Sequence, residues 1–206
     1  MIDLRSWKIK NDLTYNEEVS RKLIHLFDSI IPLSLFFLSY STVLYILIPV
    51  SIVFISIDFL RHHVKLIKDI YLYFFDRVTR NIEKKNNTFT GATYYLLGCL
   101  LTMLLFNEKS IIVASLLTMS VADSFAAIIG IKYGSTKIYN NKSLEGSFTF
   151  FIISFLILNI FIPSLTIYFC IIIALVVTLV ELFSFHYVND NITIPISCAL
   201  LIKFLA

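Results

Sequence analysis

Long apolar segments, each bounded by polar or charged residues, are the feature that most constrains the fold of this chain. Apolar residues run through them continuously rather than at every second position, which excludes the alternation of a transmembrane β-barrel. A backbone inside lipid must satisfy its own polar groups, so helices are the remaining solution. We expect about seven membrane spans, at residues 22–39, 43–60, 91–107, 110–131, 146–162, 165–185 and 192–206.

The composition agrees with this interpretation. A chain of 206 residues that is 58% hydrophobic holds more apolar surface than a soluble domain of its size needs. We therefore predict an all-α, polytopic transmembrane helical bundle in which residues 21–206 form a single domain, after a polar or interfacial segment at 1–20. Residues 61–90 are charged but carry apolar side chains at helical spacing, which predicts an amphipathic helix lying on the cytoplasmic membrane surface or on the bundle.

The charge distribution predicts an orientation for the bundle. Seven spans put the N-terminus and the connections 61–90, 132–145 and 186–191 on one side, and that side carries 15 of the 17 Lys and Arg residues. The positive-inside rule assigns this side, with the N-terminus and the polar motifs, to the cytoplasm. The basic connection 61–90 lacks the context of a nucleic-acid module, so we expect lipid headgroups as its anionic partner and no nucleic acid.

Asp123 lies inside the fourth predicted span, where a charged group costs at least ~2.5 kcal/mol, so it is a functional-site candidate. Small residues follow around it at a spacing of four, at Ala122, Ala126, Gly130 and Gly134. This spacing puts them on one helix face, which lets a second backbone approach closely. The same face would also suit a helix-mediated homodimer.

Four acidic residues lie at or near membrane depth, and they differ in whether a basic residue stands close to them in the sequence. Arg21, His25 and Asp28 follow at spacings of four and three and so share one helix face, and Asp58 likewise lies close to Arg61 and His62, so structural ion pairs are an alternative to function there. No basic residue stands within a turn of Asp123 or Glu181. We interpret these two as ligands of a shared cation, and Mg²⁺ fits because it binds one or two carboxylates together with substrate phosphates.

The connection after the fourth span supplies groups for an anion. Lys137 and Lys142 bring positive charge, and Ser143 stands at the start of the next helix, where backbone amides attract phosphate. Alternatively, Lys137 and Lys142 are surface lysines of the kind that cytoplasmic connections of membrane proteins commonly carry. Glu145 and Asp190 are further metal candidates. There is no Walker A motif, and the glycine pair Gly130 and Gly134 alone is a weak phosphate-binding signal.

At this point the motifs resemble a known family, the dolichol kinase, phytol kinase and CTP-dependent diacylglycerol kinase family. The similar segments span residues 20–200 in the family's order and are RKLIH at 21–25, Arg80 with Glu83, TGATYYLLG at 90–98, the block from Asp123 to Gly134, KSLEGS at 142–147, Glu181, and DNITIP at 190–195. The core block is also similar to that of the more distant phosphatidate cytidylyltransferases. Asn189 departs from the pattern, since the family often has a second acid there.

The resemblance implies CTP as the phosphate-donor substrate and a lipid alcohol as its acceptor. It implies that Asp123, Glu145 and Lys142 are catalytic and that Asp123, Glu145, Glu181 and Asp190 are candidate Mg²⁺ ligands. It implies nucleotide or phosphate contacts for Lys137, Lys142 and Ser143, the glycines 130 and 134, and Arg21, Lys22, His25 and Arg80.

The hypothesis is an integral-membrane kinase that transfers the γ-phosphate of CTP, or of another nucleoside triphosphate, to a polyprenol, a phytol-like alcohol or diacylglycerol. One alternative is a cytidylyltransferase that makes a CDP-lipid and releases pyrophosphate instead of CDP. A membrane ion or solute carrier is an alternative of another class, and it would distribute its acids across the membrane, whereas here the polar groups gather toward one face.

Overall fold

The computed structural model describes residues 15–76, 78–79, 83–84, 88–139, 142–184 and 189–206, and it is 80% helical, which confirms the all-α class. Its helical elements are α2 (Tyr15–Phe27), α3 (Ile30–Ser34), α4 (Tyr40–His63), α5 (Lys65–Phe75), α7 (Gly91–Leu105), α8 (Lys109–Leu117), the π-helical η1 (Thr118–Ala122), α9 (Asp123–Lys132), α10 (Leu144–Phe161), α11 (Ile167–Leu182) and α12 (Asp190–Leu205).

Three helical stretches are long and apolar enough to cross a membrane. They are α4, the continuous run α8–η1–α9 from Lys109 to Lys132, and α10. The apolar helices α7 and α11 are shorter, at 15 and 16 residues. Except for the first, each predicted span coincides with a helical stretch to within a few residues.

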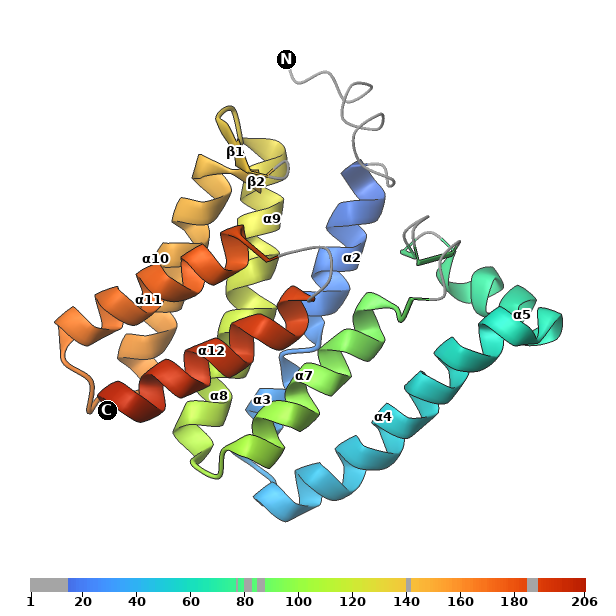
Figure 1. Cartoon of the computed structure of the whole chain (residues 1–206), viewed down its shortest axis with the longest axis horizontal. Coiled ribbons are helices and arrows are strands. Elements are labelled where there is room, and N and C mark those ends of the chain that lie inside the picture. The colour runs from blue at the N-terminus through green and yellow to red at the C-terminus, as the bar shows by residue number, and fades with distance from the viewer. Residues whose placement is uncertain (1–14, 77, 80–82, 85–87, 140–141, 185–188) are drawn as a thin grey trace.

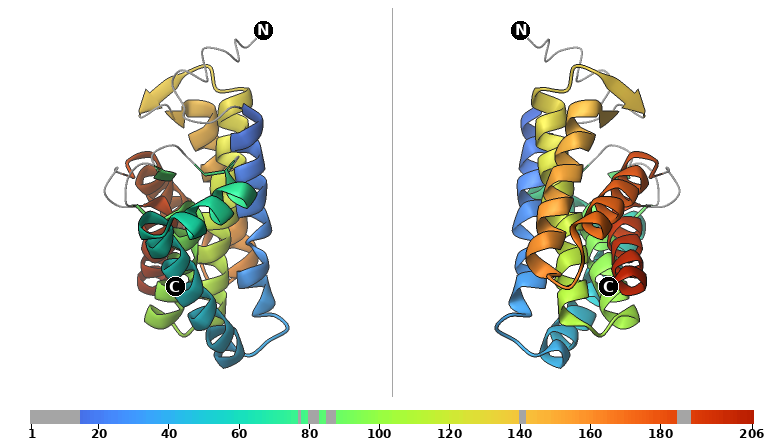
Figure 2. Two further views of the ribbon diagram at one scale, coloured as in Figure 1. Left: turned by 90° about the vertical axis from the view of Figure 1, so that its right-hand side faces the viewer. Right: turned by 90° about the vertical axis from the view of Figure 1, so that its left-hand side faces the viewer.

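The run α8–η1–α9 forms the centre of the bundle (Figure 1, Figure 2). Of its most apolar stretch, 78% is buried, against 22% for α4 and 28% for α10. The helices α10, α12 and α2 pack directly against it. Asp123 therefore lies on the most buried of these three stretches, at the junction where η1 passes into α9.

The first predicted span, 22–39, is wrong as a single helix, because α2 ends at Phe27 and α3 starts at Ile30. Pro32 explains the interruption, since it has no amide to donate to the carbonyl of Asp28 four residues earlier. That carbonyl accepts from the Ile31 amide at 3.0 Å and from the hydroxyl of Tyr95 at 2.8 Å. The hydrogen bond from Tyr95 thus links the end of α2 to α7.

The connection 132–145, which we expected to be a loop, contains a small antiparallel hairpin. Its strands are β1 (Lys137–Tyr139) and β2 (Lys142–Ser143). The helices on either side, α9 and α10, cross closely through glycine. A Cβ atom added to Gly146 would lie 2.9 Å from the carbonyl oxygen of Ala126 and 3.3 Å from the Cα of Gly130. The small-residue face is thus filled by α10, as its spacing predicts.

Helix α4 lies at the periphery of the bundle, where it packs on α7, and α5 continues from it after a bend at Val64 (Figure 1). Two buried charged residues fix this corner. Arg61 Nε lies 2.8 Å from Asp58 Oδ1, and the Arg61 guanidinium stacks over the ring of Tyr71 at 5.0 Å from its centroid. The ion pair expected between Asp58 and Arg61 is confirmed.

Candidate active site

The polar side chains of the motifs gather at one end of the bundle. The C-terminal ends of α9 and α11 and the N-terminal ends of α2, α10 and α12 lie there, beneath the hairpin in Figure 1, whereas Asp123 stands further into the bundle, at the N-terminal end of α9. Helix N-termini carry partial positive charge and free amides, and they favour anions. The topology therefore directs several favourable helix ends toward one region.

The central pair of this region joins Asp123 of α9 to Lys22 of α2. The Lys22 ammonium donates a hydrogen bond to Asp123 Oδ2, and both residues are buried. His25 Nε2 lies 3.6 Å from the same oxygen. The expectation that Asp123 has no basic partner was wrong, because its partner is 101 residues away in sequence and only the packing of α2 on α9 brings the two together.

His25 connects this pair to the break between α2 and α3. Its Nδ1 lies 3.9 Å from Asp28 Oδ2, and its ring packs edge-on against Tyr95 with centroids 5.0 Å apart. Arg21 pairs instead with Glu18, one turn earlier on α2. Of the three residues expected to share this face, His25 and Asp28 thus lie near each other, whereas Arg21 pairs with Glu18.

A second ion pair joins the partly buried Lys142 to the buried Glu181. Lys142 Nζ is 2.6 Å from Glu181 Oε1, and it also donates to the Glu181 carbonyl and, at 3.4 Å, to Ser184 Oγ. Lys142 thereby ties the hairpin to the C-terminal end of α11. The charge of Lys142 also acts on Asp123, and Asp123 in turn acts on Glu181. The two pairs form one electrostatic cluster.

The start of α10 supports the polar region structurally. Ser143 Oγ caps the helix by accepting from the Gly146 amide at 3.2 Å. Glu145 Oε1 accepts from the Ser135 amide at 2.9 Å, from the Ser135 hydroxyl at 2.5 Å and from the Thr136 amide at 3.3 Å. The side chain of Glu145 thus holds the turn between α9 and β1.

Gly134 allows that turn, because an added Cβ there would lie 2.1 Å from the Gly130 carbonyl oxygen and 2.4 Å from Ser143 Oγ. Gly130 faces Ser143 and Gly146 in the crossing of α9 and α10. Both glycines therefore have a packing role in the structure. Nucleotide contact by either one stays a prediction.

The N-terminal end of α12 completes the region. Asn189 is the capping residue, and its Oδ1 accepts from the Asn191 amide at 3.0 Å, a role that asparagine fills as well as aspartate does. Asp190 follows in the first turn, and its charge also acts on Glu181. The side chain of Asn191 donates to the Gly91 carbonyl at 3.2 Å, so α12 and α7 are joined here.

Two further candidates are not joined to these pairs by any hydrogen bond or ion pair among the described residues. Lys137 is exposed on β1, and Arg80 lies outside the described residues. Tyr95 and Glu18 were not among the predicted site residues. The ion pair of Glu18 and Arg21 was predictable, because the two residues are three positions apart on one helix. Nothing in the sequence pointed to Ser184, because its contact depends on the hairpin position.

The donor set fits a hard cation held together with a ligand. Among the described residues, no three His, Cys, Asp or Glu side chains converge as a metal site on their own. Mg²⁺ does not require that, since it commonly binds one or two carboxylates plus phosphates. Glu181 Oε2 is buried and has no hydrogen-bond partner among the residues that the structure describes. An unused carboxylate oxygen in this place suits such an ion.

Comparison with known proteins identifies the family. The chain is 32% identical over 193 residues to an uncharacterized protein of Rickettsia prowazekii, covering 90% of this chain and 93% of that protein. It is 31% identical over 154 residues to CTP-dependent diacylglycerol kinase 1 of Saccharomyces cerevisiae, covering 73% and 52%. It is 37% identical over 139 residues to a probable phytol kinase 1 of Oryza sativa, covering 60% and 44%.

The chain belongs to the polyprenol kinase family. The resemblance drawn from the motifs is thereby confirmed. This member of the polyprenol kinase family spans about half the length of the yeast and rice kinases that it matches. No family model matches the chain, and no solved structure matches it.

Proposed function

We propose that this protein is a membrane kinase that transfers the γ-phosphate of CTP to the hydroxyl of a lipid alcohol. The observation that carries the proposal is the pair of ion pairs in which Lys22 meets Asp123 and Lys142 meets Glu181, with both carboxylates buried. Its family membership supports a phosphotransferase with an alcohol as acceptor, and the yeast relative, which is named CTP-dependent, supports CTP as the donor. The acceptor class covers polyprenols, phytol-like alcohols and diacylglycerol.

The proposed reaction is an in-line displacement. The acceptor oxygen bonds to the γ-phosphorus, the bond to the bridging β–γ oxygen breaks, and CDP leaves with that electron pair. The hydroxyl proton passes to a carboxylate oxygen of Asp123. Positioning and charge stabilisation carry most of such a transfer, so the lysines and the helix N-termini are the main contributors.

Each cation of the cluster has a role in this scheme. Lys22 and Lys142 are held by carboxylates, and they can turn their ammonium groups toward a triphosphate that enters between them. Arg21 and His25 would contact the nucleotide or the new lipid phosphate, and Arg80 and Lys137 would add phosphate contacts. When bound, Mg²⁺ would neutralise the β- and γ-phosphate oxygens, and Asp123 and Glu181 would hold it, with Glu145 and Asp190 as further candidates.

We also propose the membrane arrangement that the sequence suggests. The shorter apolar helices would complete about seven spans, and the site would face the cytoplasm, where CTP and Mg²⁺ are available. Helix α5 would lie on the cytoplasmic membrane surface, because none of its residues is buried and Leu66, Ile70 and Phe74 expose one apolar face. Residues 21–206 would act as one domain after the segment 1–20, and a homodimer would be compatible with the lightly buried α4.

The experiment that tests the function uses the purified protein in detergent with Mg²⁺ and either [γ-³²P]CTP or [γ-³²P]ATP. Dioleoylglycerol, phytol, geranylgeraniol and a short polyprenol serve as acceptors for the kinase, and phosphatidate is tested separately as the acceptor that a cytidylyltransferase would need. We expect label from CTP in the organic phase and CDP in the aqueous phase. Release of pyrophosphate would indicate a cytidylyltransferase, and absence of labelled lipid with every alcohol and both nucleotides would refute the kinase.

A further inference from the structure

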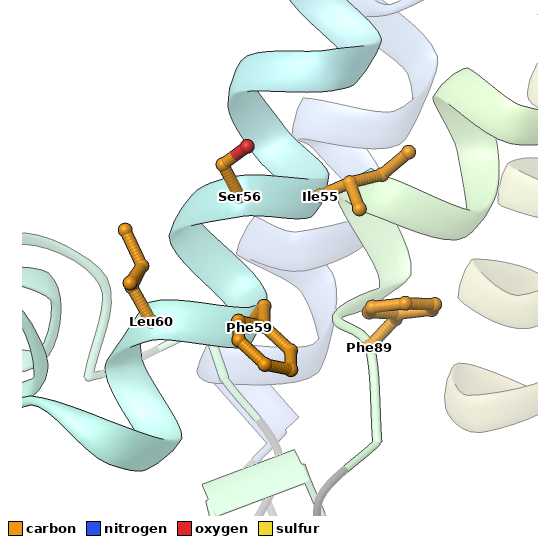
Figure 3. Close-up of a pocket in the computed structure, with 5 residues that line it drawn as sticks. All are labelled: Ile55, Ser56, Phe59, Leu60 and Phe89. Atoms are coloured by element: carbon orange, nitrogen blue, oxygen red, sulfur yellow. The ribbon is translucent and has the colours of Figure 1, made fainter.

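A groove between α4 and the start of α7 has the position and the lining of a site for a hydrocarbon chain. Five residues line it, namely Ile55, Ser56, Phe59, Leu60 and Phe89, and they enclose about 350 Å³ (Figure 3). This volume is at the small end of ligand pockets, which run about 300–1,000 Å³, so it holds part of a long chain. The hydroxyl of Ser56 is bonded to the Ile52 carbonyl at 2.7 Å, so it offers little to a polar ligand.

The wall formed by Phe89 is held in place from both sides. Arg61 Nη2 donates to the carbonyl of Thr88 at 3.0 Å. Asp58 Oδ2 accepts from the amide and the hydroxyl of Thr90, at 2.7 and 2.9 Å. Asp58 and Arg61 are themselves paired and buried, so the residues before and after Phe89 are fixed to α4. These contacts hold the Phe89 side of the groove against α4.

The groove leads toward the candidate active site. Two residues after Phe89, a Cβ atom added to Gly91 would lie 3.8 Å from Arg21 Nη1. Helix α7 starts at Gly91 and rises about 1.5 Å per residue, so Tyr95 stands roughly 6 Å further along the helix axis. Tyr95 packs against His25, which contacts Asp123. An amphiphile with its tail in the groove would thus direct its head toward the cationic cluster.

The groove also opens where lipid would surround it. It lies on the last turns of α4, the least buried of the three membrane-crossing stretches. An alcohol dissolved in the bilayer could enter it sideways, without passing through water. Its polar end would stop at the level of Asp58 and Arg61, which are close to the end of the apolar stretch.

We infer that this groove binds the hydrocarbon tail of the acceptor alcohol and aligns its hydroxyl with the site. This inference rests on the proposed kinase function and adds to it the place at which the acceptor is recognised. The recognised class is a single-headed amphiphile with a flexible apolar chain. Ordinary phospholipid or a second copy of the protein in the groove are the competing occupants.

Photolabelling tests the groove separately from catalysis. The full-length protein in phosphatidylcholine nanodiscs is irradiated with diacylglycerol or geranylgeraniol that carries a diazirine on its chain, and the labelled peptides are mapped. We expect labelling at 55–60 and 88–90 that excess unlabelled alcohol removes and extra phosphatidylcholine does not. Labelling that excess alcohol leaves unchanged would assign the groove to bilayer lipid, and absence of labelling at 55–60 and 88–90 would mean that the alcohol does not enter it, for example because a second copy covers it; both would overturn the inference.

A filled groove provides the matched kinetic test. Ser56→Trp should cut the competed labelling and raise the KM for a long-chain alcohol by about tenfold, with the KM for CTP changed less than about twofold. Val53→Trp is the control, because Val53 is exposed on the same helix and does not line the groove. Equal effects of the two variants would overturn the inference. If the unaltered protein phosphorylates no alcohol, the proposed function fails, and the competition experiment still decides whether the groove binds the alcohol.

Discussion

The buried pair of Lys22 and Asp123 predicts that stability and activity respond differently to the same substitutions. Asp123→Asn leaves the Lys22 ammonium buried without its counter-charge, and Lys22→Met does the same to the carboxylate. Removing one partner of a buried pair costs about 3–5 kcal/mol. For a chain of this size about 1 kcal/mol changes Tm by roughly 2–4 °C, so each single variant should melt roughly 6–20 °C lower.

The double variant Lys22→Met with Asp123→Asn removes both charges together. No unpaired charge remains in it, so we expect its Tm to return most of the way to that of the unaltered protein, because replacing a buried pair with neutral groups is often nearly neutral. Under the proposed function all three variants lose phosphate transfer. Recovery of stability without recovery of activity would separate the chemical role of Asp123 from its structural one.

A thiol-reactive dye measures these melting temperatures. Cys99, Cys170 and Cys198 are buried and free, so they react only as the bundle opens. The control is Glu108→Gln, which removes an exposed ion pair with Lys203 and should cost at most about 1 kcal/mol, or roughly 4 °C. The reasoning is refuted if Asp123→Asn melts no lower than this control, or if the double variant is no more stable than either single one.

Two further predictions concern packing and orientation. Gly98→Ala should prevent stable folding, because its Cβ would lie 2.0 Å from the Asn191 carbonyl oxygen. Gly91→Ala is the control and should fold, because its Cβ would be 3.8 Å from the nearest atom. The yield of monodisperse protein in detergent measures the difference, and equal yields would contradict the prediction. Cysteine at Lys137 should react with a membrane-impermeant maleimide from the cytoplasmic side and cysteine at Lys203 from the other side, since both lysines are exposed; labelling of both from one side would contradict the orientation.

Local sequence patterns were sufficient for the helices and for the family. Continuous apolar runs gave the positions of α4, α7, α10, α11 and α12 because lipid leaves a chain few alternatives to a helix. The spacing of Ala126 and Gly130 predicted a close helix contact, and α10 supplies it through Gly146. The pair of Asp58 and Arg61 was predictable for the same reason, since three residues on a helix bring two side chains to one face.

The tertiary structure alone decided how the acids are partnered and where the first helix breaks. Lys22 and Asp123, and likewise Lys142 and Glu181, are far apart in sequence, so no local spacing reveals them. Their pairing follows from the packing of α2 on α9 and of the hairpin on α11. The break after Phe27 lies where Pro32 has no amide to donate, and the Asp28 carbonyl accepts from the Tyr95 hydroxyl of α7 as well as from the Ile31 amide. Periodicity along a chain determines which face a residue occupies, but only the fold determines what meets that face.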